Sequence, residues 1–374
     1  MNTKILHTLC STPTAPFAEQ HVVRYIERFA AARPKLKLSR DPHGNLLLEL
    51  PSSSPTRLVF TAHMDHPGFI ADRMLDNRTL LAHFRGGVLA SYLPKSKVLF
   101  FPITPTPSKG EPGRPRPVSA TVLTATSDQS DRPDYPTHAT LRVSQSIDPG
   151  TPGMFDQGES RIKGDKFYSR VCDDLAGAAA ALTMLDILAK SKTPPQATIA
   201  VLLTRAEEEG FIGAIAASLK PRLLRKTDNL IAIETSAEQP YAPQGKGAII
   251  RIGDRTSVFN SDLSYFLTTQ AESLAKSDKS FQFQRALMPG GTCEATVYDI
   301  YGFRAASICV ALGNYHNMDK QKQRIAPEYV DMNDWTNMTK LFVHLARHAH
   351  EYQPGHKLLK QRIESRYDRL KHLL

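Results

Sequence analysis

The sequence has 374 residues, of which 41% are hydrophobic and 22% charged, a composition that is ordinary for a soluble folded protein and long enough for two domains. Its formal net charge of +10 is compatible with nucleic acid or an acidic partner, but the excess of Lys and Arg is spread thinly, which favours a solvated basic surface. Residues 1–20 contain no long apolar run, so neither a signal peptide nor a membrane anchor is predicted, and a cytoplasmic location is expected. The four cysteines show no paired spacing and are expected to be reduced, mostly buried thiols.

The N-terminal part of the chain predicts a helix followed by strands. Residues 22–31 carry apolar side chains at three-to-four spacing, which is typical of an amphipathic helix. A turn-rich stretch at residues 41–45 is expected to join two strands. Residues 58–62 (LVFTA) predict a buried strand that ends at His63 and Asp65, and these two side chains point to the same side because strand side chains alternate.

The next segment has a different character. Residues 68–166 lack a helical period, and ten prolines lie between Pro102 and Pro152, which excludes long helices in that stretch. We therefore expect a small inserted β-rich domain over residues 68–166. Within it, residues 105–116 and 127–136 are predicted to be loops.

Helices and strands alternate after this insert. Helices are predicted over residues 175–189, 213–219 and 335–348, and strands over residues 197–204, 230–233 and 305–312. This alternation predicts an α/β fold with a mixed, mostly parallel sheet covered by helices on both faces. The main domain is expected to be discontinuous, comprising residues 1–67 and 167–374. Its candidate functional residues follow the predicted strands, where open α/β sheets bind ligands.

The end of the chain, residues 356–374, is predicted to form an amphipathic helix. Leu359, Ile363, Tyr367 and Leu370 lie at helical spacing, and six Lys or Arg residues occupy the remaining faces. We expect this helix to pack on the body of the protein or on a neighbouring subunit. Binding to a membrane surface or to nucleic acid is the alternative.

Five scattered segments each offer a side chain that can bind a metal ion. Zinc and similar ions accept imidazole nitrogen and carboxylate oxygen, and a pair of such ions needs one carboxylate that bridges both. Asp173 is the best bridging candidate, whereas the adjacent Asp174 is also explained as the N-cap of the following helix. Asp65 is suited to orient the His63 ring. The candidates are His63, Asp173, Glu207 with Glu208, Glu234 and His316.

The acidic candidates meet two different chemical needs. One carboxylate must coordinate a metal ion and a second must take a proton from bound water, and the neighbours Glu207 and Glu208 satisfy both. Glu234 follows an apolar run, where a buried charge must be paired or bound to a metal. His316 follows a predicted strand and would complete a second metal site. Each residue taken alone also has an ordinary explanation, as a helix cap, a surface turn or a structural histidine.

In this order the segments resemble the tetrahedral aminopeptidases and their relatives, peptidase family M42, within the co-catalytic zinc exopeptidases. The resemblance covers nearly the whole chain. It rests on residues 41–45 (DPHGN), 62–69 (AHMDHPGF), 173–177 (DDLAG), 207–214 (EEEGFIGA), 233–235 (IET), 290–292 (GGT) and 315–316 (YH).

The resemblance implies a role for each candidate residue. His63 and Glu234 would hold one divalent metal ion, Glu208 and His316 would hold the other, and Asp173 would bridge them, with zinc as the expected metal and cobalt or manganese as alternatives. Glu207 would be the general base. The resemblance further implies a cis peptide bond between Asp173 and Asp174, and an insert that serves as a lid and builds dimers and dodecamers.

The sequence thus predicts a cytoplasmic two-metal aminopeptidase that removes N-terminal residues from short peptides and forms a homo-oligomer, from dimer to dodecamer, without a membrane partner. Where the family has aspartate after Gly-Gly-Thr, this chain has Cys293 and then Glu294. This departure keeps open a metal-dependent amidohydrolase or deacylase of N-acylated small molecules. A basic nucleic-acid-binding protein is the remote alternative. The preferred N-terminal residue, the native metal and the number of subunits are not predicted.

Overall fold

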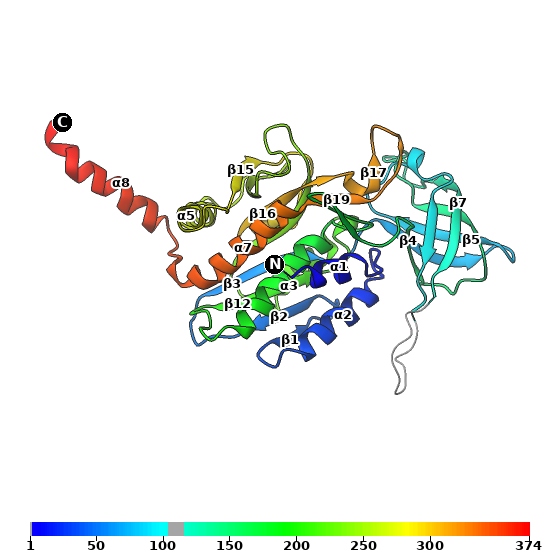
Figure 1. Ribbon diagram of the computed structural model, residues 1–374, viewed down its shortest axis with the longest axis horizontal. Coiled ribbons are helices and arrows are strands. Elements are labelled where there is room, and N and C mark those ends of the chain that lie inside the picture. Colours follow the sequence, from blue (N-terminus) through cyan, green and yellow to red (C-terminus); the bar gives the residue numbers. More distant parts are fainter. Residues whose placement is uncertain (1, 104–115) are drawn as a thin grey trace.

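The computed structural model describes residues 2–103 and 116–374 and is built around one large mixed sheet (Figure 1). The strands of this sheet lie in the order β1 (Lys37–Arg40), β2 (Leu46–Leu50), β12 (Thr198–Thr204), β3 (Arg57–His63), β13 (Asn229–Ala237), β16 (Arg304–Gly313), β19 (Glu328–Asp331), β11 (Lys166–Ser169) and β10 (Arg161–Lys163). Two further strands, β14 (Ala248–Gly253) and β15 (Phe283–Leu287), extend it beside β16. The fold is therefore mixed α/β.

Strand direction differs from the prediction of a mostly parallel sheet. The central strands β12, β3, β13 and β16 are parallel to one another. The outer pairings are mostly antiparallel, and six of the ten pairings between described strands of this sheet are of that kind. The prediction of a mostly parallel sheet is therefore wrong beyond the centre. A run of apolar residues reports that a strand is buried and carries no information about its direction.

Helices cover both faces of the sheet. Alternate residues of β12 pack on opposite sides: Ile199 and Val201 contact the cluster that includes α1, α2, α3, α5 and α7, whereas Ala200 and Leu202 contact the cluster that includes α4 and α6. Burial on both faces explains why these strands are continuous apolar runs. The helices are α1 (Lys4–Cys10), α2 (Gln20–Ala31), α3 (Leu175–Lys190), α4 (Ile212–Leu219), α5 (Ser261–Ser277), α6 (Glu294–Ile300), α7 (Met332–His348) and α8 (Lys357–Leu370).

A small closed barrel lies to one side of the sheet and has its own core. Four phenylalanine rings meet inside it, with the Phe69 ring centroid 4.9 Å from that of Phe84 and 5.5 Å from that of Phe155. The barrel strands are β4 (Gly68–Met74), β5 (Thr79–Arg85), β8 (His138–Val143), β7 (Val118–Thr126), β6 (Lys97–Phe100) and β9 (Pro152–Phe155), within the predicted insert of residues 68–166. The division of the chain into domains stays a prediction, and the predicted loop at 105–116 lies outside the described residues except for Arg116.

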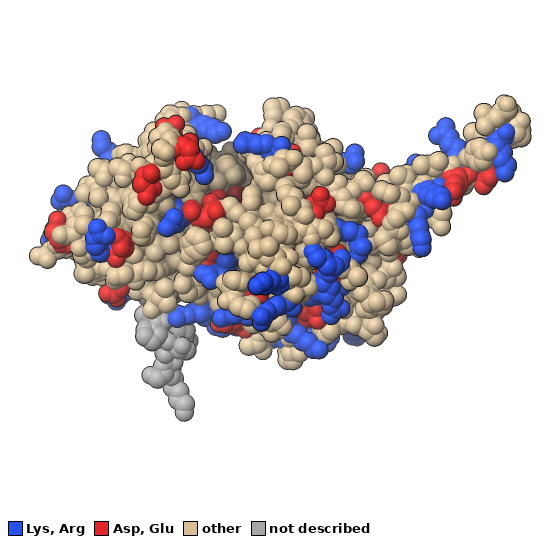
Figure 2. All heavy atoms as spheres, turned by 180° about the vertical axis from the view of Figure 1, so that it is seen from behind, with Lys and Arg blue, Asp and Glu red and all other residues tan. Residues whose placement is uncertain are grey.

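The C-terminal helix α8 forms as predicted but does not pack on the body. It projects away from the end of α7 (Figure 1), and Figure 2 shows Lys and Arg along its length. Its apolar side chains are exposed, with Ile363 at 59% and Tyr367 at 57%. The prediction that this helix packs on the body is therefore wrong. Helical spacing identifies an apolar face but does not show which surface covers it. Packing on a neighbouring subunit stays a prediction.

Two composition-based predictions concern the rest of the chain. All four cysteines are free and buried, which confirms the prediction of reduced thiols. Elsewhere on the face drawn in Figure 2, Lys and Arg gather over the lower part of the body on the side from which α8 projects, and are interspersed with Asp and Glu over the rest. None of the described helices is long and apolar enough to cross a membrane.

Candidate metal centre

The predicted metal-binding side chains meet at one edge of the large sheet. His63 is the last residue of β3, and Glu207 and Glu208 lie in the short helix η2 (Glu207–Glu209) that follows β12. Asp173 lies just before α3, and His316 lies in η3 (Tyr315–Asn317) after β16. The parallel strands β12, β3, β13 and β16 are neighbours, so their C-terminal ends bring His63, η2 and η3 together. Asp173 follows β11, which runs in the same direction two strands beyond β16.

Glu234 lies inside its strand, whereas the sequence predicted that it follows the end of the strand. The predicted strand ended at Ile233, but β13 continues to Ala237, and Glu234 is paired in register with Cys309 of β16. Its side chain is nevertheless directed to the same site and contributes to the pocket wall. The prediction that every candidate lies beyond a strand end is therefore wrong for Glu234.

Ligand atoms of the predicted residues gather in two groups. Within each group, one ligand atom from every residue lies within 4.8 Å of the others. One group contains the predicted base, Glu207, together with the two residues that were predicted to bind the first ion, His63 and Glu234. The groups are His63 with Glu207 and Glu234, and Asp173 with Glu208 and His316.

Asp173 lies between the two histidines. Its Oδ1 is 3.5 Å from His63 Nε2, and its Oδ2 is 3.7 Å from His316 Nε2. Glu208 Oε2 approaches the same His316 nitrogen to 3.2 Å. Each oxygen of Asp173 thus faces a different histidine, which is the arrangement that a bridging carboxylate requires. The peptide bond between Asp173 and Asp174 is cis, as the family resemblance implied.

The donor atoms suit divalent cations. Zinc lies about 2.0–2.1 Å from nitrogen and oxygen ligands, so two ligands of a tetrahedral ion are about 3.3 Å apart. The separations of 3.2–3.7 Å between the histidine nitrogens and the oxygens of Asp173 and Glu208 are close to this value and mostly exceed hydrogen-bond length. Asp173 Oδ1 and Glu208 Oε1 are buried without a hydrogen-bond partner among the described residues. Unpartnered buried carboxylate oxygens are costly unless a cation binds them.

Burial and neighbouring charges shift the pKa values of several site residues. Burial raises the pKa of Glu207 well above its usual value, and burial, together with the charge of Asp173, raises the pKa of Glu234 to about 8. Burial acts to lower the pKa of His316, but the carboxylates of Glu208 and Asp173 raise it to about 9. At neutral pH, Glu234 and His316 therefore hold protons that bound cations would displace. Metal binding here must release protons and weaken at acidic pH.

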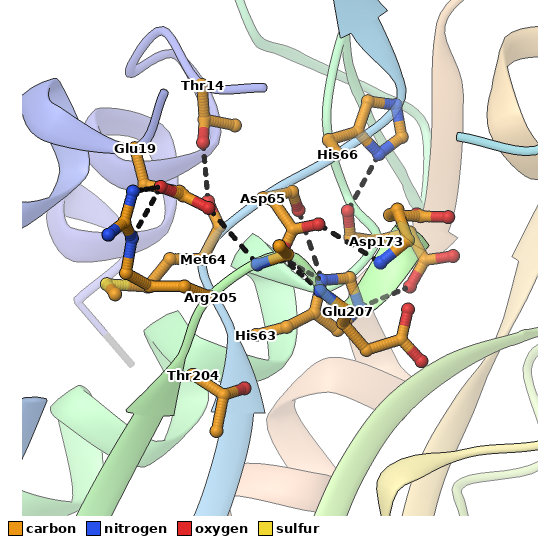
Figure 3. A network of polar contacts seen from close by, with 12 residues as sticks. Thr14, Glu19, His63, Met64, Asp65, His66, Asp173, Thr204, Arg205 and Glu207 are labelled. Atoms are coloured by element: carbon orange, nitrogen blue, oxygen red, sulfur yellow. Dashed lines mark hydrogen bonds and ion pairs between the residues drawn. The ribbon is translucent and has the colours of Figure 1, made fainter. Parts of the chain in front are cut away.

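Asp65 connects β3 with the turn that carries the two glutamates (Figure 3). Its Oδ1 accepts a hydrogen bond from Glu207 N at 3.0 Å, and its Oδ2 accepts one from Glu208 N at 3.1 Å. His63 Nδ1 is 3.1 Å from the main-chain oxygen of Asp65 and 3.7 Å from its carboxylate. The main-chain carbonyl is therefore the nearer partner of the His63 ring, and the carboxylate mainly fixes the backbone of Glu207 and Glu208.

We expect the substitution Asp65→Asn to lower kcat/KM by about 10–100-fold. The amide group of asparagine would turn an N–H toward either Glu207 N or Glu208 N, so one of the two backbone hydrogen bonds would be lost. Steady-state kinetics at saturating metal concentration measures the effect. An unchanged kcat/KM would show that the carboxylate does not fix this turn.

Three residues support the site without having been singled out in the sequence. His66 Nδ1 donates to the main-chain oxygen of Asp173 at 2.8 Å, and His316 Nδ1 donates to the main-chain oxygen of Gly87 at 2.8 Å. Glu328 accepts hydrogen bonds from the backbone N–H groups of Cys172, Asp173 and His316. His66 lies inside the AHMDHPGF motif, but Gly87 and Glu328 are far in sequence from their partners and carry no local pattern.

A pocket of about 940 Å³ opens onto the site. It is lined by barrel residues, among them Tyr92 and Arg132, and by residues around the large sheet, among them Arg251. Cys293 and Glu294, which depart from the family pattern, are 0% and 2% exposed and are not among the described lining residues. The two residues that differ from the family pattern therefore lie behind the pocket wall and not in it.

Residues 44–341 match the family model described as M42 glutamyl aminopeptidase, which covers most of the chain. The chain belongs to peptidase family M42. This confirms the resemblance found in the sequence, and the M42 protein is accordingly a metal-dependent aminopeptidase, a peptide hydrolase. No curated protein matches its sequence.

Solved structures share the fold of this M42 protein at low sequence identity. An aminopeptidase from the archaeon Desulfurococcus kamchatkensis superposes with a TM-score of 0.74 at 19% identity, covering 94% of this chain and 97% of that one. The TET1 peptidase of Pyrococcus horikoshii superposes with a TM-score of 0.71 at 19% identity, covering 92% and 98%. An M18-family aminopeptidase from Thermotoga maritima gives a TM-score of 0.65 at 14% identity, covering 92% and 95%.

Proposed function

We propose that this M42 protein is a two-metal aminopeptidase in which His63 and Glu234 hold one ion, Glu208 and His316 hold the other, and Asp173 bridges the two. The observation that carries this proposal is the position of Asp173, whose two carboxylate oxygens face two different histidines. A single ion would not need a carboxylate that faces both ways. Zinc is the proposed metal, with cobalt or manganese as alternatives.

Glu207 is the proposed general base. When bound, two divalent cations supply an acidified water and polarise the carbonyl of the scissile bond. Glu207 borders the pocket, and its raised pKa, caused first by burial, suits a group that must accept and return a proton. Its carboxylate takes the proton of the attacking water and passes it to the leaving amine. Asp65 holds the Glu207 backbone during both transfers.

Arg251 favours substrates with an acidic N-terminal residue. Its side chain is 3% exposed and lines the pocket. Its Nε is buried without a hydrogen-bond partner among the described residues, and its guanidinium lies 5.9 Å from the Phe259 ring centroid. Arginine stays charged, and a buried guanidinium with an unused N–H donor at the pocket wall suits a substrate carboxylate. The matching family model is described as a glutamyl aminopeptidase, which agrees with this chemistry.

The remaining features of the proposal concern the setting of the enzyme. Short peptides are the proposed substrates, because the pocket lies between the barrel and the large sheet and has a limited volume of about 940 Å³. A homo-oligomer is proposed because structures of similar proteins are described as a dodecamer and as tetrahedral or octahedral shells. A cytoplasmic location is proposed from the sequence.

Hydrolysis of glutamyl and leucyl p-nitroanilides, compared with N-acetylated amino acids, tests this function. We expect activity on the free-amine compounds with added zinc, cobalt or manganese, and a higher kcat/KM for glutamyl. Arg251→Met should lower kcat/KM for the glutamyl substrate by about 10–100-fold, as expected for a lost charged hydrogen bond, with little change for leucyl. The control is Arg255→Met, since Arg255 Nη2 is already bonded to Gly290 O at 2.8 Å. Activity on only the acetylated compounds would instead support a deacylase.

A further inference from the structure

A buried carboxylate that is no candidate ligand lies directly behind the metal centre. Glu328, the first residue of β19, is 0% exposed. Its Oε2 accepts hydrogen bonds from Cys172 N at 2.7 Å and from Asp173 N at 3.1 Å, while its Oε1 accepts one from His316 N at 2.9 Å. One side chain therefore binds the backbones of two segments that lie far apart in the sequence.

These two segments carry ligand groups that must keep a fixed separation. Asp173 Oδ2 and His316 Nε2 are 3.7 Å apart, and a metal ion between them tolerates little change in this distance. His316 also adopts a left-handed backbone conformation, with φ of 54°, which an ordinary side chain rarely takes without support. The hydrogen bond from His316 N to Glu328 supplies such support at the backbone, and Gly87 O supplies it at the ring.

Hydrogen bonds stabilise the buried carboxylate of Glu328. A buried carboxylate without partners would be strongly unfavourable. Three backbone N–H donors offset this cost. Glutamine would keep the size of the side chain but offers a single acceptor oxygen, so it cannot satisfy both ligand segments.

We propose that Glu328 is a positioning residue that sets the distance between Asp173 and His316 and thereby the affinity of the second metal ion. It acts through the backbone of these two residues and touches neither substrate nor reacting atoms. Asp65 has the corresponding contacts on the other side of the centre, where its carboxylate binds the backbones of Glu207 and Glu208. The proposal rests on the two-metal function proposed above.

Metal affinity measured directly tests this proposal. Metal-free wild type and Glu328→Gln are titrated with Co²⁺ by calorimetry and by visible absorption, which reports the coordination geometry. We expect the weaker of the two ions to bind about 10–100-fold less tightly in the variant, with an altered cobalt spectrum and activity that recovers at higher Co²⁺. The shortened variant Glu328→Asp, which keeps the charge, provides the same comparison if the glutamine variant does not fold.

Asp334→Asn is the matched control. Asp334 is also 0% exposed, and it accepts hydrogen bonds from Gly245 N at 2.8 Å and Gly247 N at 2.6 Å, but these segments carry no candidate ligand. We expect this control to lose stability without losing metal affinity.

Two results would overturn the positioning role: Co²⁺ affinities in the Glu328 variants equal to those of wild type, or an equal loss of affinity in Asp334→Asn. Failure of the proposed function looks different, because wild type would then bind two ions and hydrolyse no peptide, and the affinity comparison would still stand.

Discussion

Replacing Glu207 with glutamine is expected to lower kcat by about 10²–10⁴-fold while both metal ions stay bound. Glutamine keeps the size of the side chain and its hydrogen-bonding backbone, which Asp65 holds, but it cannot accept the proton of the attacking water. Steady-state kinetics on a glutamyl substrate, together with elemental analysis of the same preparation, measures both parts of this expectation.

Glu209→Gln is the matched control for this experiment. Glu209 is the neighbouring acid in η2, but its carboxylate accepts a hydrogen bond from Gly86 N at 2.8 Å and lies 3.5 Å from Arg85, outside both ligand groups. We expect it to keep most of its activity. A fully active Glu207→Gln variant would refute the assignment of the base, whereas loss of a metal ion would identify Glu207 as a ligand, in line with its grouping with His63 and Glu234.

Replacing Asp173 with alanine is expected to have the largest effect on metal content. Since its two oxygens face His63 and His316, the substitution removes one ligand from each proposed ion. We expect affinity for both ions to fall by more than about 100-fold, because losing a ligand costs more than losing a supporting contact, and activity to fall to background. Calorimetric titration of the metal-free variant with Zn²⁺ measures the affinities.

Asp186→Asn serves as the control for Asp173→Ala. Asp186 lies in α3, which follows Asp173 in the chain, and pairs with Arg33 at 2.7 Å and Lys190 at 2.7 Å on the surface. We expect normal metal binding from it. If Asp173→Ala still bound two ions with wild-type affinity, the bridging role would be wrong.

The arrangement of the centre was largely predictable because its residues follow conspicuous strands. Residues 58–62 and 197–204 are apolar runs that end in His63 and in the pair Glu207 and Glu208, and parallel neighbours bring such ends together. Glu234 was found by the same pattern, although its strand continues past it. A charged residue at the end of an apolar run predicted that Glu234 lies near the other candidates, and one of its ligand atoms lies within 4.8 Å of those of His63 and Glu207, although the strand boundary was wrong.

Other features depend on contacts that no local pattern records. Glu328 gains its importance from Cys172, Asp173 and His316, which only the folded chain brings near it. The outer strand β15 has just one buried residue, Ala286, so its sequence carries little strand signal. The apolar stripe of α8 likewise predicted the helix correctly but not its exposure to solvent. Helical spacing shows that a helix has an apolar face, but it does not show which surface that face contacts.

We propose that two metal ions, bridged by Asp173, activate this peptidase. The most direct test is a titration of the metal-free protein with Zn²⁺, in which bound metal per chain and hydrolysis of a glutamyl p-nitroanilide are recorded together. We expect two bound ions per chain, one for each ligand group, with full activity only when both are present. Full activity with one ion per chain, or with none, would contradict it.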